Sequence, residues 1–500
     1  MAQEIYRPPA LLDVLRIPLL GRVLKWRYGR LLFQLPLLTV ALLLVYDGFT
    51  GSTLASQNLA SVVPWIHYRG LVVLALLLVG NLFCMSCPFT LPRTLAKRLS
   101  SRGGRFPRIL RSKWLAITSL LLLFFIYEWL DLWASPALTA WVIVAYFVAA
   151  FVLEAVFSES PFCKYVCPLG TFNFVYSTLS PLQITTRNAE VCRTCVGKEC
   201  LNGSYSPQPV IMIDQIGGDG QPIASHTNDK HGTLGCGTQL FVPQIKSNMD
   251  CVLCLDCVRS CPHDNVALAA RVPAAEVLRP DALPKRWDIA LLFMCLTFMG
   301  VLNAFGMVPP VYDLLQTLAA PLLNLGVSDL LAQGVALLLL FGGGGVLLPA
   351  LLTAAIARLS KALAQSKLSV REIAATFAPA FVPLGFGIWV AHYSFHFLTG
   401  FMTVVPVFQK FLADHGAAVT PDWSLSGVQD MAVIGLVQAV ALFGGWVASS
   451  YFIQRLALRL YRRQAFAGML PWMLLTLGLA LAALWIFSLP MEMRGVNLFG

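Results

Sequence analysis

Long apolar runs separated by short basic segments make up most of this chain. Runs long enough to cross a hydrocarbon core of about 30 Å occur at residues 31–49, 68–86, 114–134, 138–158, 287–309, 331–357, 373–398, 427–452 and 467–489. Residues 310–328 are expected to lie along the outer surface of the membrane. The pattern predicts an all-α polytopic membrane protein with about nine transmembrane helices.

The distribution of lysine and arginine predicts how these helices cross the membrane. Segment 88–113 carries eight basic residues, whereas segment 50–66 carries none. Because cytoplasmic loops hold the excess of basic residues, we expect the N-terminus and segment 88–113 in the cytoplasm and the C-terminus in the periplasm. This pattern predicts a multi-pass membrane protein. We see no cleavage site typical of a signal peptide before the first span.

A change in composition divides the chain into four predicted parts. Between residues 159 and 286 the apolar density falls, and cysteine, glycine, proline and polar residues take over. This segment follows the fourth span, so we expect a cytoplasmic domain inserted between two membrane domains. The predicted parts are a basic lead-in at 1–29, a four-span domain at 30–158, the inserted domain at 159–286 and a five-span domain at 287–500.

Overall composition supports a membrane protein and restricts its partners. Of the 500 residues 57% are hydrophobic and 12% charged, whereas soluble domains contain about a quarter charged residues. The net charge of +11 is explained by lysine and arginine beside apolar spans. No separate basic surface is left for nucleic acid, so we expect contact with membrane lipid and none with nucleic acid. Thirteen cysteines in clustered motifs indicate metal ligation rather than disulfides.

The strongest chemical signal is the sequence CVLCLDCVRSCP at residues 251–262. Its spacing, C-x2-C-x2-C-x3-C-P, is typical of [4Fe–4S] ferredoxins, in which the fourth cysteine binds the other cluster of a pair. A structural zinc site is the alternative, but such a site normally stops at two C-x2-C pairs. The motif therefore predicts that Cys251, Cys254 and Cys257 hold one cluster and that Cys261 belongs to a second.

Four more cysteines complete the number that two [4Fe–4S] clusters need. Cys192, Cys195 and Cys200 lie in VCRTCVGKEC, and Cys236 lies in GTLGCGTQL. Crossed ligation predicts that Cys236 completes the cluster of Cys251, Cys254 and Cys257, and that Cys261 completes the other. The first motif is irregular, so a histidine such as His226 or His231 is an alternative to Cys236.

Two further cysteine pairs are predicted at the cytoplasmic membrane edge. They are Cys84 and Cys87 in CMSCP, and Cys163 and Cys167 in CKYVCPLG. Helices that both end inside can bring these four thiols together. A third cluster and a redox-active dithiol pair are both open, and buried apolar cysteines are the structural alternative.

Three histidines lie near the predicted outer ends of spans: His67, His392 and His396. His392 and His396 are four residues apart and share a helix face, so they cannot be axial ligands on opposite sides of one haem. Either could pair with His67 around a b-type haem. Helix packing, or binding of quinone or metal, is the equally supported alternative.

The motifs CMSCP, CKYVCPLG and CVLCLDCVRSCPHDNV together resemble the membrane-bound polyferredoxins of the NapH and NosR type, related in motif to the assembly ferredoxin CcoG. The resemblance covers roughly residues 30–285. It implies an inner-membrane electron-transfer protein whose cytoplasmic clusters exchange electrons with the membrane and with a periplasmic partner. The resemblance also implies that seven cysteines are ligands of the two clusters: Cys192, Cys195, Cys200, Cys251, Cys254, Cys257 and Cys261.

The leading functional hypothesis is electron transfer between a cytoplasmic donor, the clusters, and a membrane quinone or periplasmic redox protein. We find no nucleophile–base pair or phosphate-binding loop, which favours a subunit of an oxidoreductase system over a stand-alone enzyme. The alternative is an assembly or metal-reduction factor for a periplasmic or membrane metalloenzyme, with Met491 and Met493 as its one weak indication. An ion-translocating subunit is disfavoured because the C-terminal spans hold few acidic residues.

Overall fold

The computed structural model describes residues 12–99, 104–157, 159–204, 232–279, 281–426 and 430–491. The chain forms two compact units built from interleaved segments. The first comprises Met1–Thr39, Ala75–Ile109 and Tyr146–Leu283, and the second comprises Val40–Leu74, Leu110–Ala145 and Pro284–Gly500. All predicted cysteine ligands belong to the first unit and all three candidate histidines to the second.

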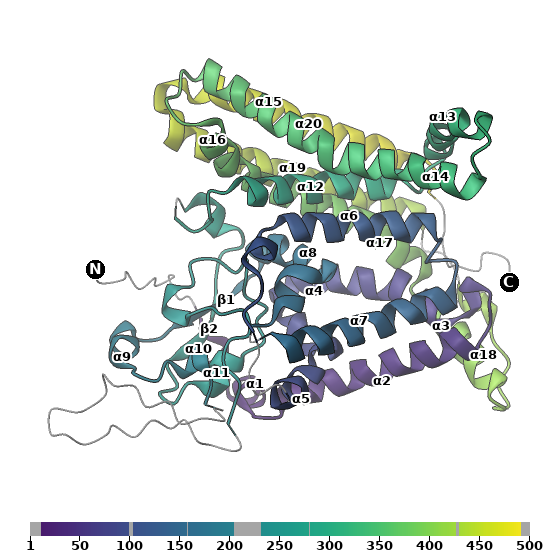
Figure 1. Cartoon of the computed structure of the whole chain (residues 1–500), viewed down its shortest axis with the longest axis horizontal. Helices are drawn as coiled ribbons and strands as arrows, with labels where there is room; N and C mark the ends of the chain where they lie inside the picture. Colours follow the sequence, from purple (N-terminus) through teal and green to yellow (C-terminus); the bar gives the residue numbers. More distant parts are fainter. Residues whose placement is uncertain are drawn as a thin grey trace. The chain divides into compact units, whose positions relative to one another are not determined.

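The fold is mostly helical, as the apolar pattern predicted (Figure 1). Its helices are α1 Pro18–Lys25, α2 Gly29–Thr50, α3 Leu59–Val62, α4 Arg69–Val79, α5 Pro92–Leu99, α6 Trp114–Trp129, α7 Pro136–Val156, α8 Pro168–Tyr176, α9 Ala189–Thr194, α10 Glu199–Asn202, α11 Asp256–Ser260, α12 Trp287–Phe305, α13 Pro310–Asn324, α14 Asp329–Leu338, α15 Leu348–Leu363, α16 Val370–Phe377, α17 Val382–Gly400, α18 Val404–Asp414, α19 Met431–Tyr461 and α20 Ala465–Ser488. The strands are β1 Leu182–Thr186 and β2 Val266–Ala270.

Among the described residues, seven helical segments are long and apolar enough to cross a membrane. They are Gly29–Thr50, Leu59–Thr90, Pro136–Val156, Trp287–Phe305, Asp329–Leu363, Val370–Gly400 and Trp423–Ser488. The chain is therefore a membrane protein. The difference from about nine predicted spans has two sources: α6 has 16 residues, fewer than the roughly 20 of a usual span, and Trp423–Ser488 contains both α19 and α20. The count of nine and the orientation remain predictions.

The second predicted span, at 68–86, is not one regular helix. α4 ends at Val79, and Gly80 takes a left-handed conformation with φ +64° before a 3-10 helix at Gly80–Ser86. A Cβ atom at Gly80 would lie 1.8 Å from the Ser180 hydroxyl oxygen. Glycine permits both this close approach and the positive φ, and the turn that follows carries Cys84.

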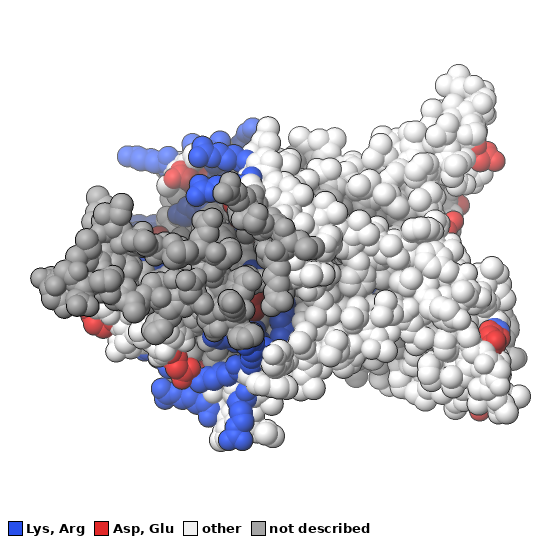
Figure 2. Space-filling view, turned by 60° about the horizontal axis from the view of Figure 1, so that its bottom comes forward, with Lys and Arg blue, Asp and Glu red and all other residues white. Residues whose placement is uncertain are grey.

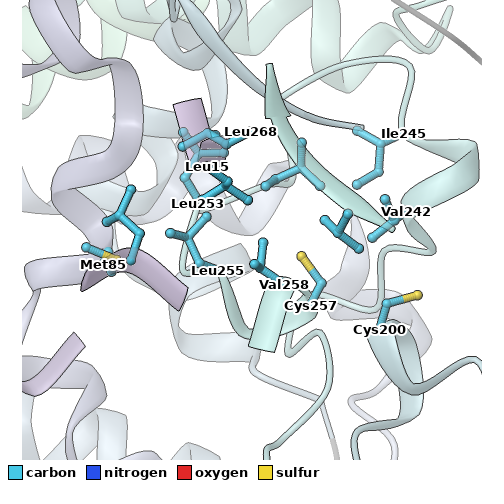
Figure 3. Packing of buried hydrophobic residues seen from close by; sticks show 13 residues of the cluster. Leu15, Met85, Cys200, Val242, Ile245, Leu253, Leu255, Cys257, Val258 and Leu268 are labelled. Carbon is cyan, nitrogen blue, oxygen red and sulfur yellow. The ribbon is translucent and has the colours of Figure 1, made fainter. Parts of the chain in front are cut away.

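The core of the first unit surrounds a two-stranded antiparallel sheet. β1 pairs with β2 in the register Leu182↔Ala270 to Thr186↔Val266. The central side chains, among them Leu253, Leu255 and Leu268, are fully buried (Figure 3). The loop that carries the 251–261 motif is thus fixed by its own leucines in the hydrophobic core.

The second unit is a bundle in which α12 and α17 are the most buried helices. In their apolar segments 83% and 89% of the residues are buried. α17 packs closely on α19, where a Cβ atom at Gly387 would lie 2.4 Å from the Ala441 carbonyl oxygen. α15 and α20 lie side by side in the same unit (Figure 1). Small residues at such crossings let membrane helices approach closely.

Outward-facing apolar side chains follow a helical period on the candidate spans. On α19, Leu436, Val440 and Phe443 are 65%, 63% and 64% exposed. Their spacing of three or four residues places them on one face. Figure 2 shows a broad surface that carries neither basic nor acidic side chains. Such a surface fits contact with lipid.

Candidate iron–sulfur sites

Four cysteines of the first unit surround one small cavity, and we name them group I: Cys236, Cys251, Cys254 and Cys257. All four line a cavity of about 40 Å³. A negative charge on Cys236 would raise the pKa of each of the other three thiols, because the four cysteines lie close together. This is the set that crossed ligation predicts for one cluster.

The backbone of the motif wraps around this cavity because two of its leucines adopt left-handed conformations. Leu253 has φ 45° and Leu255 has φ 60°, and their side chains are held in the core. α11 then begins at Asp256, which places Cys257 in its first turn. Strained backbone of this kind persists only where packing holds it and is common at functional sites.

The other four predicted ligands form a second set, group II: Cys192, Cys195, Cys200 and Cys261. All four line a separate cavity of about 20 Å³. The thiolate charge of Cys261 interacts with those of Cys192, Cys195 and Cys200. The structure therefore brings together both predicted sets of four.

The two groups adjoin each other through buried cysteines. Cys200 and Cys257 belong to the same hydrophobic cluster (Figure 3), and their thiolate charges interact. The main-chain N–H of Cys236 also donates to the Cys200 carbonyl oxygen at 3.2 Å. A contact between the groups is what electron exchange between two centres would require.

Several cysteine sulfurs accept hydrogen bonds from N–H groups. Leu240 donates its main-chain N–H to Cys236 Sγ at 3.3 Å, and Asn265 donates its own to Cys261 Sγ at 3.4 Å. The Asn265 side-chain amide donates to Cys192 Sγ at 3.1 Å. Hydrogen bonds to the sulfurs are one of the features that set the potential of an iron–sulfur centre.

Burial strongly disfavours free thiolates at these positions. It raises the pKa of Cys200 and of Cys254 to about 12, with nearby thiolates acting in the same direction on both. The pKa of Cys257 is likewise raised, by burial and by the charges of its group. Without a bound cation the thiols would be protonated, whereas a coordinated thiol is deprotonated.

The donor set of each group fits a [4Fe–4S] cluster: four cysteines around a cavity, with N–H donors at the sulfurs. Within the described ranges, no group of three or more histidine, cysteine, aspartate or glutamate side chains is arranged to hold a metal ion. The four cysteines of a [4Fe–4S] cluster would each bind a different iron, so the four sulfurs need not converge on a single metal ion. The eight ligand assignments remain predictions.

The four remaining motif cysteines also come together, and we name them the edge group: Cys84, Cys87, Cys163 and Cys167. The charge of Cys84 interacts with those of the other three. Cys163 lies in a π-helical turn, Phe162–Val166, a form common at functional sites. Cys167 caps α8 and accepts the Gly170 N–H at 3.3 Å. The edge group adjoins group I, because Cys84 interacts with Cys254 and Cys163 lines the group I cavity.

The three candidate histidines make contacts typical of helix packing. His67 Nδ1 lies 3.2 Å from the Val62 carbonyl oxygen and Nε2 lies 2.9 Å from that of Phe401. His392 Nε2 lies 3.3 Å from Asn303 Nδ2, and His396 Nε2 lies 3.2 Å from Met307 Sδ. Nε2 of each ring is thus engaged, and binding a haem iron through it would break an existing contact.

Two of the other sequence hypotheses fall partly on residues that the structure does not describe. His226, His231 and Met493 lie outside the described residues. Met491 packs against the hydrophobic cluster of Ala304, Val308 and Ile486. This packing is a structural reason for a methionine at that position.

Two curated proteins share short stretches of sequence with this chain. Over 157 residues it is 26% identical to YccM of Escherichia coli (strain K12), which is provisionally named an electron transport protein. The matched stretch covers 31% of this chain and 33% of YccM. Over 73 residues it is 27% identical to MauN of Paracoccus denitrificans (strain Pd 1222), which is named a methylamine utilization ferredoxin-type protein. The matched stretch covers 15% of this chain and 24% of MauN.

The chain therefore spans about a third of the first relative and about a quarter of the second. No family model and no solved structure matches it. The two similarities support a ferredoxin-like electron transport family and a general role in electron transfer. They do not separate the NapH, NosR and CcoG types that the motifs resemble.

Sequence reasoning missed the polar residues that support the cysteines. Asn265 and Asn173 donate to cysteine sulfurs, and Asn81 donates to the Cys251 carbonyl oxygen. Arg30 and Arg93 contact Asp256 next to group I. Asn265 lies at the end of the quoted motif CVLCLDCVRSCPHDNV, but its side-chain partner Cys192 is distant in sequence. The other residues belong to no recognisable motif, and their partners are distant in sequence.

Proposed function

We propose that this chain is a multi-span membrane electron-transfer protein that passes electrons between cytoplasmic [4Fe–4S] clusters, held by groups I and II, and a quinone or a periplasmic redox protein. The proposed setting is a bacterial inner membrane, with the N-terminus in the cytoplasm and a soluble donor on that side. The type we propose is that of the NapH, NosR and CcoG membrane polyferredoxins, with an additional C-terminal bundle.

The observation that carries this proposal is the order in which the three cysteine groups adjoin one another. Group II adjoins group I, since Cys200 and Cys257 share one hydrophobic cluster, and group I adjoins the edge group, since Cys163 lines the group I cavity. Cys84 closes the candidate span Leu59–Thr90. A series of redox centres leading to a membrane helix is an electron path, because the roughly 30 Å hydrocarbon core is too wide for one efficient tunnelling step.

A bound [4Fe–4S] cluster supplies a one-electron carrier whose potential depends on hydrogen bonding and exposure. The chain's own residues would bind the cluster, tune its reduction potential and shield it from water. The cysteines would supply thiolates, Leu240 and Asn265 donate N–H groups to their sulfurs, and Leu253 and Leu255 are fully buried in the adjoining core. For the edge group we propose a third cluster, since its sulfurs also accept hydrogen bonds, from Gly170 and Asn173. The contacts of the three histidines support helix packing, so the proposal includes no haem.

The test is anaerobic purification followed by iron and sulfide analysis and electron paramagnetic resonance (EPR). Two clusters give about eight irons per chain and three give about twelve. The protein should then exchange electrons with a quinol analogue in proteoliposomes. Protein that contains zinc in place of iron, or clusters that never exchange electrons with quinol or a redox protein, would contradict the proposal. Loss of metal, rather than of electron supply, in a periplasmic enzyme on deletion would favour the assembly alternative.

A further inference from the structure

A buried network of charged side chains lies between group I and the edge group. Asp256 accepts a hydrogen bond from Arg93 Nη1 at 2.9 Å and contacts Arg30 Nη1 at 3.4 Å and Arg259 Nη1 at 3.1 Å. The side chains of Arg30, Arg93 and Arg259 are 15%, 12% and 4% exposed, and that of Asp256 is 8% exposed. Solvent therefore screens these charges little.

Arg30 reaches the edge group as well. Its Nη2 donates to the Thr90 hydroxyl at 2.5 Å, and that hydroxyl donates to the Cys87 carbonyl oxygen at 2.8 Å. The positive charge of Arg30 interacts with the thiolates of Cys87 and Cys163 on one side and of Cys254 on the other. Thr90 and Asp256 thus fix one guanidinium between two cysteine groups.

Among the described residues, the printed ion pairs of this network join three guanidinium groups to two carboxylates, Asp256 and Glu154, the latter 3.8 Å from Arg93, so positive charge is in excess in this set. An uncompensated buried charge is costly, so the arrangement calls for a further anion nearby. Four thiolates around an iron–sulfur core leave a net negative charge, and group I lies beside the network. The excess positive charge of the arginine network would therefore be compensated by the negative charge of a cluster in group I.

We infer that Arg30 is a positioning residue that holds a positive charge between group I and the edge group and so raises the reduction potential of the group I centre. Reduction adds one electron and breaks no bond, so the reduced form carries one more negative charge. A nearby cation of low exposure stabilises that form more than the oxidised form. The inference rests on the proposed function, because it requires a centre in group I.

The test is an EPR-monitored redox titration of the full-length protein, purified anaerobically. We expect R30Q to lower the reduction equilibrium constant of the group I centre by at least about tenfold, which is about 59 mV for one electron. R30K keeps the charge and should give a smaller shift. R16Q is the matched control, because Arg16 is 75% exposed and its charge is screened by salt. The group II centre is the reference within each sample.

A second variant separates charge from structure. Asp256→Asn removes the negative partner and should raise the potential of the group I centre, opposite to R30Q. Equal shifts of both centres, shifts of the same sign in R30Q and D256N, or no shift would overturn the inference. If R30Q does not bind iron, D256N decides: an unchanged or lower potential of its group I centre would overturn the inference. Wild-type protein without clusters would contradict the proposed function instead.

Discussion

Asn265 donates its side-chain amide to the sulfur of Cys192 at 3.1 Å and its main-chain N–H to the sulfur of Cys261 at 3.4 Å. Cys192 and Cys261 are far apart in sequence, and one asparagine contacts both. Its Oδ1 also accepts the main-chain N–H of Asn188 at 2.8 Å, which fixes the chain before α9. Asn265 therefore holds two parts of group II in place and supplies hydrogen bonds to both sulfurs.

Asn265→Asp should lower the reduction potential of the group II centre. The substitution keeps the shape and the acceptor for the Asn188 N–H. It replaces the amide, which donates to Cys192 Sγ and also to the Asn188 carbonyl oxygen at 2.6 Å, by a negative charge. We expect the reduction equilibrium constant to fall by about tenfold, or about 59 mV for one electron, measured by EPR titration. Asn202→Asp is the control, because the Asn202 amide donates to the Gly197 carbonyl oxygen in an exposed position. Equal potentials in N265D and wild type would show that this hydrogen bond does not tune the centre.

The sequence predicted which cysteines belong together but not what surrounds them. The spacing of Cys251 to Cys261 predicts that the fourth cysteine binds a different cluster from the first three. In the structure, Cys261 lines a cavity with Cys192, Cys195 and Cys200. The partners of Asn265, Arg30 and Gly80 depend on long-range packing that no local pattern encodes. The same limit affected the spans, because an apolar run does not reveal that α4 ends at Val79 and continues as a 3-10 turn.

The edge group should account for about a third of the iron. We expect about twelve irons per chain in the wild type and about eight in the C84S/C163S double variant, because four thiols lie together there and the sulfurs of Cys84 and Cys167 accept N–H hydrogen bonds. The measurement is iron and labile sulfide per chain after anaerobic purification. About eight irons in both proteins would indicate a dithiol pair instead, and thiol counting before and after reduction would then identify it.

The ion pair of Arg271 and Glu276 should be important for the stability of the first unit. Arg271 Nη1 lies 2.8 Å from Glu276 Oε2, and the two side chains are 5% and 0% exposed. Glu276→Ala leaves a buried guanidinium without its carboxylate, which should lower the free energy of unfolding by about 3–5 kcal/mol. Arg16→Ala removes an arginine that is 75% exposed, and Asp13 keeps its ion pair with Arg187, so the loss should be less than about 1 kcal/mol. Denaturant titration in detergent measures both, and equal effects would contradict the prediction.

The three histidines should bind no haem. Each Nε2 atom already contacts another group, His67 with Phe401, His392 with Asn303 and His396 with Met307. The reduced-minus-oxidised spectrum of the purified protein should therefore lack a b-haem band. A band that disappears in His67→Ala or His392→Ala would contradict this prediction and restore haem as a carrier towards the outer side.

Gly80→Ala should damage the edge group without touching a cysteine. At φ +64° an alanine is strained, and its Cβ would lie 1.8 Å from the Ser180 hydroxyl oxygen. We expect a loss of about 1–3 kcal/mol from the backbone alone, with the clash in addition. Relief of the clash must move the turn that carries Cys84, so iron bound by the edge group should fall before that of groups I and II.

Gly478→Ala is the matched control for this substitution. Gly478 lies within α20, and a Cβ atom added there would meet open space, with no neighbouring heavy atom within 4 Å. Alanine also favours a helix over glycine by about 1 kcal/mol. Iron content should therefore equal that of the wild type, and thermal stability should be equal or higher. If Gly80→Ala kept all of its iron, the turn at Gly80 would not be what positions Cys84, and the edge group would depend on its contact with Asn173 instead.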